Sequence, residues 1–411
     1  MPDADETPEK CGVGKDSAGA KKTLRIVSLA LLGDMLLYGV VVPILPVYVS
    51  RLGASQAQVG LLFGSYALAL LAATPWMGRL CGRVGSRPVL LAGLAGLSAS
   101  TLLFAGADGY ALLLIARSLQ GIAAAAIWTA GLASLAAAFA QERRGRVLAL
   151  MTTISALGTL LGPPLGGFIA EYWGQAAAFV MLALFAAAVG LAAWRDPAVA
   201  AAAQAPAQEA AGQGLLADVQ VRQIGAVIVL GASLLGLLEP MLPLDLSARL
   251  GAGPGAIGLL FAVCTVAYGL SAPVFGYLTD RFGPMRVIAC GWAAAAAVVP
   301  ALALPQTLAG QALLMLALGP AIAAMLSPTL QALATAADRH GHEYGLVYAA
   351  YNFAFAAGLL AGSLVGGALV QAFGTPAALA LTSAALAVLG IAPVAGLLRR
   401  ERERLSMARG L

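Results

Sequence analysis

Long apolar runs separated by short polar segments make up most of the chain. Each run reaches about 20 residues, the length a helix needs to cross a bilayer. None shows the ten-residue alternation of apolar and polar positions that is typical of an outer-membrane barrel strand. We therefore predict an all-helical membrane protein with twelve transmembrane helices. The expected spans are residues 24–49, 58–80, 88–106, 110–139, 147–170, 175–194, 223–248, 255–279, 286–305, 309–336, 344–371 and 375–397.

The composition agrees with a polytopic membrane protein. Hydrophobic residues make up 60% of the 411 residues, charged residues only 10%, and the mean hydropathy is +0.87. A soluble domain of this size lies far from these values. The four cysteines have neither metal-site nor disulfide spacing, and two histidines in one short loop make a poor metal site. We expect no bound metal and no nucleic acid partner.

The distribution of Lys and Arg predicts the orientation in the membrane, because cytoplasmic loops carry an excess of these residues. With both termini inside, the cytoplasmic segments hold 21 of the 24 Lys and Arg residues. The opposite loops hold Arg51 and Arg249, and Arg117 lies within a span. The first residues are hydrophilic and mixed in charge, unlike a signal peptide. Both termini are therefore predicted to be cytoplasmic.

The sequence also repeats itself. Residues around PILPVYVSRLGASQAQVGLLF return 197 to 198 positions later as PMLPLDLSARLGAGPGAIGLLF, with Arg51 matching Arg249. A stretch rich in Ala, Gln, Gly and Pro separates the copies and is typical of a linker. The predicted organisation is a cytoplasmic tail (1–23), a six-helix half (24–195), a cytoplasmic linker (196–222), a second six-helix half (223–397) and a cytoplasmic tail (398–411).

Two short segments at the repeat spacing resemble the G-x-L-x-D-R-x-G-R-[RK] signature of the major facilitator superfamily. They are GRLCGRVGSRP at 78–88 and GYLTDRFGPMR at 276–286. The first has Gly82 where the signature has Asp, so its charge latch is expected to be altered. The candidate conformational residues here are Gly78, Arg79, Arg83, Gly85, Gly276, Asp280, Arg281, Gly283 and Arg286.

Span 5 contains GTLLGPPLGGF, which resembles the antiporter motif of drug–proton exchangers. Its glycines form a smooth face that permits close helix packing, and its prolines remove backbone donors and bend the helix. Helix packing without any consequence for transport is the alternative interpretation. The candidate conformational residues are Gly158, Gly162, Pro163, Gly166 and Gly167.

Three charged residues lie deep within apolar spans, namely Asp34, Arg117 and Glu239. Charges at membrane depth are costly and usually face a partner or a wet cavity, so these three are the first functional candidates. The most plausible partner of Arg117 is Asp34. A purely structural salt bridge between them is the alternative.

Five segments, among them LGDMLLYGVVVPILPVY, LLLIARSLQGI and GLLEPMLP, are closely similar to the vesicular amine transporter family. In that family the span 1 acid recognises a protonated amine and the span 7 acid contributes to the cavity. The resemblance gives these roles to Asp34 and Glu239. This chain departs from the family at Ala323, where a span 10 acid is missing. Tyr66 and Asn352 replace a lysine and an acid, and we expect these neutral side chains to hydrogen-bond instead.

These features together favour a proton-coupled antiporter that exports organic cations, amines or amphipathic drugs by alternating access. The proton gradient would be its energy source, with no cofactor, and Arg117 would bias Asp34. Aromatic rings attract cationic amines, and the expected cavity lining is Tyr38, Tyr66, Trp128, Tyr268, Tyr348, Tyr351 and Asn352.

Three alternatives stay open: an uptake symporter, a non-transporting membrane receptor and, least favoured, a membrane enzyme. No nucleophile–base pair, phosphate loop or metal cluster is evident in the sequence. The short loop after the first span and the Ala-rich composition favour a bacterial cytoplasmic membrane. We expect a monomer in the lipid bilayer with a small-molecule substrate.

Overall fold

The computed structural model describes residues 18–196, 218–338, 344–385, 387, 388 and 390. Within these residues, eleven helices are long and apolar enough to span a membrane. Their bounds are α1 Ala18–Arg51, α2 Gln56–Val84, α3 Ser86–Ala105, α4 Tyr110–Ala138, α5 Gln141–Trp173, α6 Gln175–Arg195, α8 Val219–Leu250, α9 Pro254–Phe282, α10 Pro284–Ala301, α11 Leu308–Asp338 and α12 Tyr344–Phe373. Residues 375–385 are also helical. The rest of the expected last span, and most of the expected linker and tails, lie outside the described residues.

Glycines with positive φ end many of these helices. Gly85, between α2 and α3, has φ 88°, and Gly283, between α9 and α10, has φ 83°. Side chains other than glycine rarely adopt this backbone conformation, so both turns of the repeated signature require glycine. We call the end of the bundle that contains these two turns the Gly85 end. The opposite end, which contains Gly53, Gly174, Gly251 and Gly374, is the Gly174 end.

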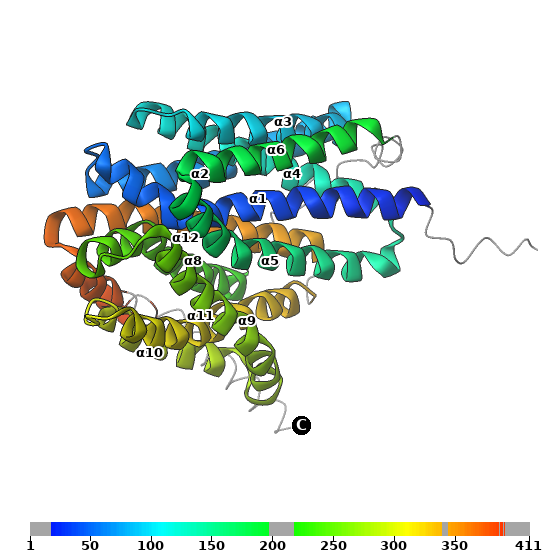
Figure 1. Cartoon of the computed structure of the whole chain (residues 1–411). Coiled ribbons are helices and arrows are strands. Elements are labelled where there is room, and N and C mark those ends of the chain that lie inside the picture. The colour runs from blue at the N-terminus through cyan, green and yellow to red at the C-terminus, as the bar shows by residue number, and fades with distance from the viewer. Residues whose placement is uncertain (1–17, 197–217, 339–343, 386, 389, 391–411) are drawn as a thin grey trace, which may run out of the picture.

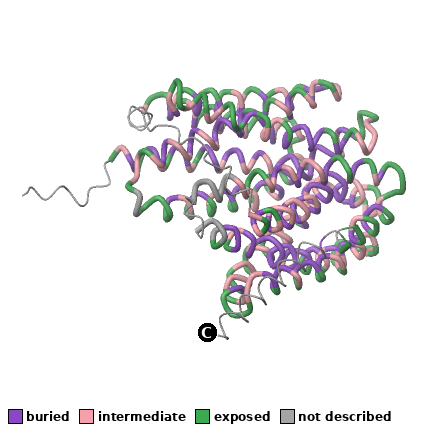
Figure 2. The backbone as a smooth tube through the Cα atoms, turned by 180° about the vertical axis from the view of Figure 1, so that it is seen from behind, coloured by how far each residue is buried: buried purple, intermediate pink, exposed green. Residues whose placement is uncertain are grey.

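The chain forms two groups of helices that correspond to the two sequence copies. In Figure 1 the first group, from blue to green, lies above most of the second group, from green to red. The buried apolar residues form two clusters, one almost entirely from the first half and one from the second. Buried residues line the inner stretches of the helices, and exposed residues lie on the outer stretches and ends (Figure 2).

The two halves meet along two seams, α2 with α12 and α5 with α9. Glycines bring the backbones together in both. A Cβ added at Gly60 would meet the Ser363 backbone oxygen, and one at Gly258 would meet the Pro163 oxygen. Both contacts lie near the start of α2 or α9, toward the Gly174 end.

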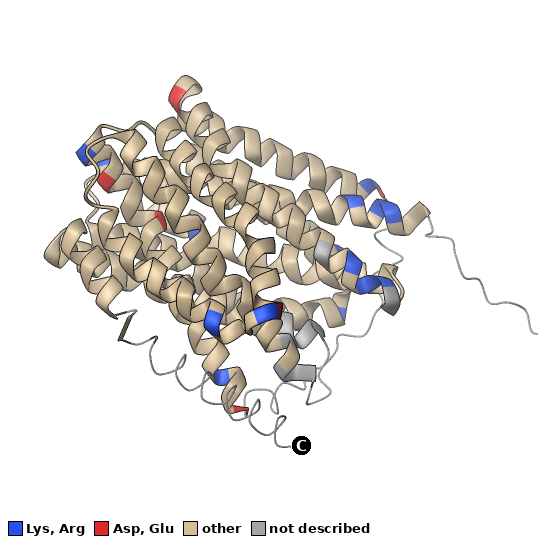
Figure 3. Cartoon of the chain, turned by 90° about the horizontal axis from the view of Figure 1, so that it is seen from below, with Lys and Arg blue, Asp and Glu red and all other residues tan. Residues whose placement is uncertain are grey.

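Toward the Gly85 end, two side-chain hydrogen bonds each lie within one half. Arg87 Nη2 donates to the Trp194 carbonyl at 2.6 Å, and Gln331 Nε2 donates to Asp280 Oδ1 at 2.9 Å. The halves are thus joined at the Gly174 end in this conformation. Most ribbon segments that carry Lys and Arg gather near the Gly85 end (Figure 3). Its cytoplasmic placement remains a prediction from this charge distribution.

Candidate functional site

Asp34 lies in the middle of α1 and is only 1% exposed. Its Oδ2 accepts a hydrogen bond from Trp128 Nε1 on α4 at 3.0 Å. No other hydrogen bond and no ion pair to this carboxylate occurs among the described residues. Burying a carboxylate costs free energy unless it is paired or neutralised. Asp34 is therefore poised to take up a proton or a cation.

Glu239 supplies the second interior carboxylate, from α8 in the other half. Tyr38 on α1 donates its hydroxyl to Glu239 Oε2 at 2.5 Å, a short bond of the kind that an ionised acceptor favours. Tyr38 follows Asp34 by one helical turn, so both project from the same face of α1. One face of α1 thus carries Asp34 and also the Tyr38 hydroxyl that binds Glu239.

Arg117 on α4 is buried at 1% exposure and is surrounded by aromatic rings. Its guanidinium carbon lies 4.4 Å from the Tyr66 ring centroid, 5.3 Å from that of Phe63 and 5.6 Å from that of Tyr38. Its Nη1 donates to Gln120 Oε1. The cation is therefore stabilised mainly by ring faces and one amide.

Asp34, the expected partner of Arg117, forms no ion pair with it, so the alternative of a structural salt bridge is not observed either. Among the described residues, no carboxylate oxygen lies within the 4.0 Å of an ion pair to Arg117, and its Nε and the Gln120 Nε2 have no hydrogen-bond partner. The physical reason is that Trp128 holds the Asp34 carboxylate while the rings of α1 and α2 enclose the guanidinium. Arg117 thus acts on Asp34 through space, without contact.

The structure adds two residues that the sequence analysis did not single out. Phe63 precedes Tyr66 by three positions and Gln120 follows Arg117 by three, so each lies on the helix face of its predicted neighbour. Both are buried and contact the guanidinium. The sequence signal that could have identified Phe63 and Gln120 is their three-residue spacing from Tyr66 and Arg117, which places each on the same helix face.

The aromatic residues predicted to line the cavity separate into two groups. Tyr38, Tyr66 and Trp128 lie together with the charges, and the Tyr38 and Tyr66 rings are 5.5 Å apart. In the second half Tyr351 stacks on Phe355 at 6.1 Å, and the Tyr268 carbonyl accepts from Ser271. The aromatic donors to the two acids are Tyr38 and Trp128, from the first group.

The expected pairing of Tyr66 with Asn352 is not formed. The Tyr66 side chain is buried against Arg117, whereas Asn352 is exposed. The Tyr66 hydroxyl has no hydrogen bond to any described residue. The side chain of Tyr348 lies outside the described residues, so its predicted place in the cavity stays a prediction.

The predicted motifs contribute packing surfaces around this site. In α5, Gly158, Gly162 and Gly166 contact Met35, Gly39 and Val40 of α1, the helix that carries Asp34. Gly167 instead contacts Pro254 and Gly255 of α9 in the other half. The antiporter-like motif therefore reaches both the acid-bearing helix and the seam.

The signature turns show little of the expected charge latch. Arg79, Arg83, Arg281 and Arg286 are exposed, and Arg281 lies over the Phe282 ring at 5.3 Å. Asp280 binds the Gln331 amide of α11. Space is open around Gly78 and Gly276, where an added Cβ would meet no atom. Their conformational role stays a prediction.

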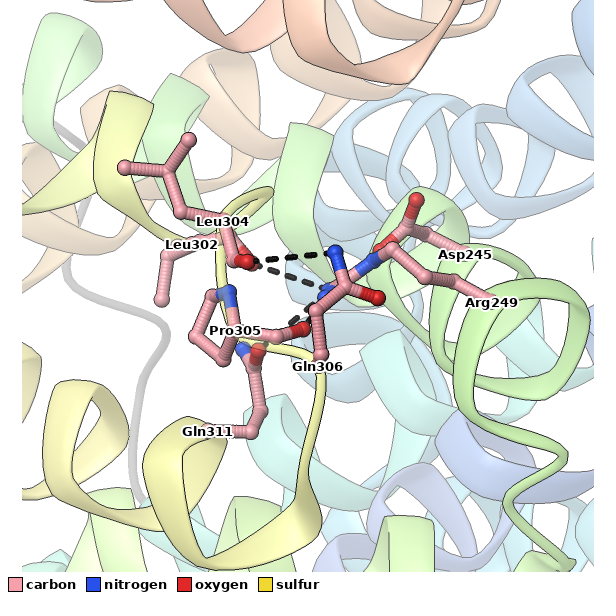
Figure 4. A network of polar contacts seen from close by, with 7 residues as sticks. All are labelled: Asp245, Arg249, Leu302, Leu304, Pro305, Gln306 and Gln311. Atoms are coloured by element: carbon pink, nitrogen blue, oxygen red, sulfur yellow. Dashed lines mark hydrogen bonds and ion pairs between the residues drawn. The ribbon is translucent and has the colours of Figure 1, made fainter.

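A second charged network lies away from this site, at the Gly174 end of the second half (Figure 4). Arg249 donates to Asp245 Oδ2 through Nε at 2.9 Å and Nη2 at 2.8 Å. It also donates to the carbonyls of Leu302 and Pro305 and to Gln311. Within the described residues there is no group of three or more His, Cys, Asp or Glu that could hold a metal ion.

Two helical halves with Asp34 and Arg117 buried and Glu239 half-buried in the interior are the arrangement expected of a membrane transporter. The sequence matches the profile of the Major Facilitator Superfamily over residues 27–238 and 224–409. The chain therefore belongs to this superfamily, and it is a multi-pass membrane protein, as expected from the apolar runs and the signature turns.

The relatives and solved structures agree with this assignment. The chain is 30% identical to the human synaptic vesicular amine transporter over 326 residues, which cover 78% of this chain and 63% of that protein. It is 28% identical to the human MFS-type transporter SLC18B1, over 84% of this chain and 79% of that protein. A bacterial homologue of the lysosomal transporter Spinster shares the fold, with a TM-score of 0.72 at 15% identity, over 93% of this chain and 96% of that one. The chain thus spans less than two thirds of the length of the vesicular amine transporters that it matches.

Proposed function

We propose that this protein is a proton-coupled antiporter that exports organic cations, amines or amphipathic drugs. The observation that carries the proposal is the pair of interior carboxylates, Asp34 and Glu239, each bound by a single aromatic donor. Such acids bind either a proton or a cationic amine, because both ligands neutralise the buried charge. The similarity to proteins named amine transporters supports the amine class.

Exchange follows when both ligands need the same carboxylates. A proton that arrives at Asp34 displaces the cation, and a cation displaces the proton, so one gradient drives the other flux as the two halves alternate. Arg117 raises the cost of a second positive charge nearby and thereby favours release. Tyr66, Phe63 and Tyr38 offer ring faces to the substrate as well as to Arg117.

Tyr38 connects binding to the conformation of the protein. Its bond to Glu239 joins α1 of the first half to α8 of the second near the middle of the bundle. Two further side-chain hydrogen bonds between the halves lie toward the Gly174 end, where the Gly255 N–H donates to Glu171 and the Ala57 N–H donates to Gln371. A proton or cation on Glu239 changes the strength of the interior bond, and so changes how firmly the halves are joined at the site.

The deciding experiment uses proteoliposomes with an imposed acid-inside gradient and a pH-sensitive dye. Amines and lipophilic cations are added outside, and Asp34→Asn is measured in parallel. Proton efflux that an amine triggers and the variant loses supports the proposal. Solute accumulation inside the vesicles under the reverse, acid-outside gradient would instead establish a symporter, and a protein that moves no protons with any compound would be a receptor.

The remaining parts of the proposal concern the setting. We place the protein as a monomer in the cytoplasmic membrane of a bacterium, with the Gly85 end inside. The proton gradient is its energy source, and no cofactor is required. The related proteins are transporters rather than enzymes.

A further inference from the structure

The two seams between the halves each end in a hydrogen bond to the start of a helix. Glu171, near the end of α5, accepts from the backbone N–H of Gly255 through Oε2 at 2.9 Å. Gln371, near the end of α12, accepts from the N–H of Ala57 through Oε1 at 3.1 Å. Each acceptor belongs to one half, and each helix that it contacts belongs to the other.

These bonds are equivalent in the repeat. Ala57 is the second residue of α2, and Gly255 is the second residue of α9. The two donors are 198 positions apart, which is the spacing of the sequence copies, and the two acceptors are 200 positions apart, within three positions of it. The same contact therefore occurs twice around the pseudo-twofold relation between the halves.

The chemistry of the contact is that of a helix cap supplied from outside the helix. The first N–H groups of a helix have no partner within it, and an acceptor there is stabilising, more so when it carries negative charge. Around each bond the backbones are too close for side chains. Gly60 lies against Gly367 in one seam and Gly167 against Pro254 in the other.

We propose that Glu171 and Gln371 are paired latches that hold the Gly174 end shut, and that both bonds must break before the site opens toward that end. The latches form only when the halves meet at this end, because neither helix can reach its acceptor otherwise. They stabilise the conformation seen here relative to the one that is open at the Gly174 end.

The two latches are unequal. Gly253, the N-cap of α9, has no side chain to cap the helix, so the Glu171 carboxylate is the acceptor at that helix start. α2 carries its own capping box, in which Ser55 and Gln58 bond each other's backbone N–H. Opening therefore exposes an uncapped helix start at α9 but a capped one at α2, so Glu171 contributes more to closure than Gln371.

Spin-label distances across the Gly174 end test the proposal directly. Labels are placed at Leu52→Cys and Leu304→Cys, two exposed positions in loops of different halves, after Cys11, Cys81, Cys264 and Cys290 are replaced by serine. We expect Glu171→Ala to increase the population of long distances about fivefold, the effect of losing a helix cap. Gln371→Ala should increase it about twofold, and the double variant more than either.

Matched variants separate the cap from general disturbance of the loop. Glu171→Gln keeps an acceptor but removes the charge, so it should increase the long distances less than Glu171→Ala does. Gln371→Glu places a charge at the start of α2 and should reduce the long distances. Gln175→Ala, at the same end with no hydrogen bond among the described residues, should change nothing.

An unchanged distance distribution in the folded double variant would overturn the proposal. If the alanine variants do not fold, Gln371→Glu decides, and the absence of any shift toward short distances in that variant is equally contrary. The measurement needs no substrate, so its outcome does not depend on whether the protein is an amine antiporter.

Discussion

The two halves have the same helical plan but place their charged groups differently. In the first half, Asp34 and Arg117 lie deep in the bundle, each 1% exposed and without an ion-pair partner among the described residues. In the second half, Arg249 lies at the Gly174 end, where it pairs with Asp245 and binds backbone carbonyls. Its repeat counterpart Arg51 is exposed. Asp34 and Arg117 of the first half thus lack an ion-pair partner among the described residues, whereas Arg249 of the second half has its charge paired within the fold.

The two copies of the repeated helical plan thus place their charged residues in different surroundings. A charge with all its partners supplied by the protein stabilises structure, whereas a buried charge with unmet bonding capacity is stabilised further by a ligand or by a change of protonation. Glu239 is an interior acid from the second half, and Tyr38 of the first half binds it. The following substitutions test the division, in order of decreasing effect on transport.

Asp34→Asn should reduce coupled transport by at least about 100-fold, because the amide cannot exchange a proton or neutralise a cation, although it still accepts from Trp128. Asp245→Asn is the matched control in the second half and should keep most of the transport. Dye-monitored exchange in proteoliposomes measures both. Equal losses in the two variants would contradict the division between the halves.

Arg117→Lys should reduce transport by about tenfold in a folded protein, because a lysine ammonium is a compact charge that does not match the planar stacking against three rings and the bond to Gln120. Initial rates at saturating and limiting substrate separate binding from turnover. Full activity in this variant would show that charge alone matters at position 117.

Tyr38→Phe should change apparent substrate affinity about threefold, because the hydroxyl bond to Glu239 is lost while the ring next to Arg117 remains. Tyr48→Phe is its control. The Tyr48 hydroxyl donates to the Ala107 carbonyl at 2.5 Å near the Gly174 end, within the first half. We expect no change of affinity there. Concentration dependence of exchange measures both variants, and an unchanged affinity in Tyr38→Phe would contradict the coupling role.

Arg249→Lys should leave transport within about twofold but lower the free energy of unfolding by about 1–3 kcal/mol, because carbonyls and Asp245 lose donors. Arg51→Lys should change it by less than about 0.5 kcal/mol, as is usual for an exposed residue. Thermal unfolding in detergent gives the comparison. A strong transport defect in Arg249→Lys with unchanged stability would reverse the interpretation of this network.

The sequence was most informative about elements whose physics is local. Apolar runs fix the helices because a backbone in lipid must satisfy its own hydrogen bonds, and glycines at Gly85 and Gly283 fix the turns because of their positive φ. Asp34, Arg117 and Glu239 stand out because charge in such a run is rare. Phe63 and Gln120 were missed, since an ordinary apolar or amide side chain gives no signal of its own.

Tertiary structure decided which of these residues meet. The sequence indicated Asp34 as the partner of Arg117. Because of the way α1, α2 and α4 pack, Asp34 instead accepts a hydrogen bond from Trp128, and Arg117 lies against three aromatic rings. Likewise, Tyr38 reaches Glu239 from 201 positions away, and Glu171 and Gln371 cap helices of the opposite half. Helix formation and burial depend on composition and local spacing, which the sequence contains directly. Partner choice depends on how rigid helices approach one another, and only the folded chain determines that.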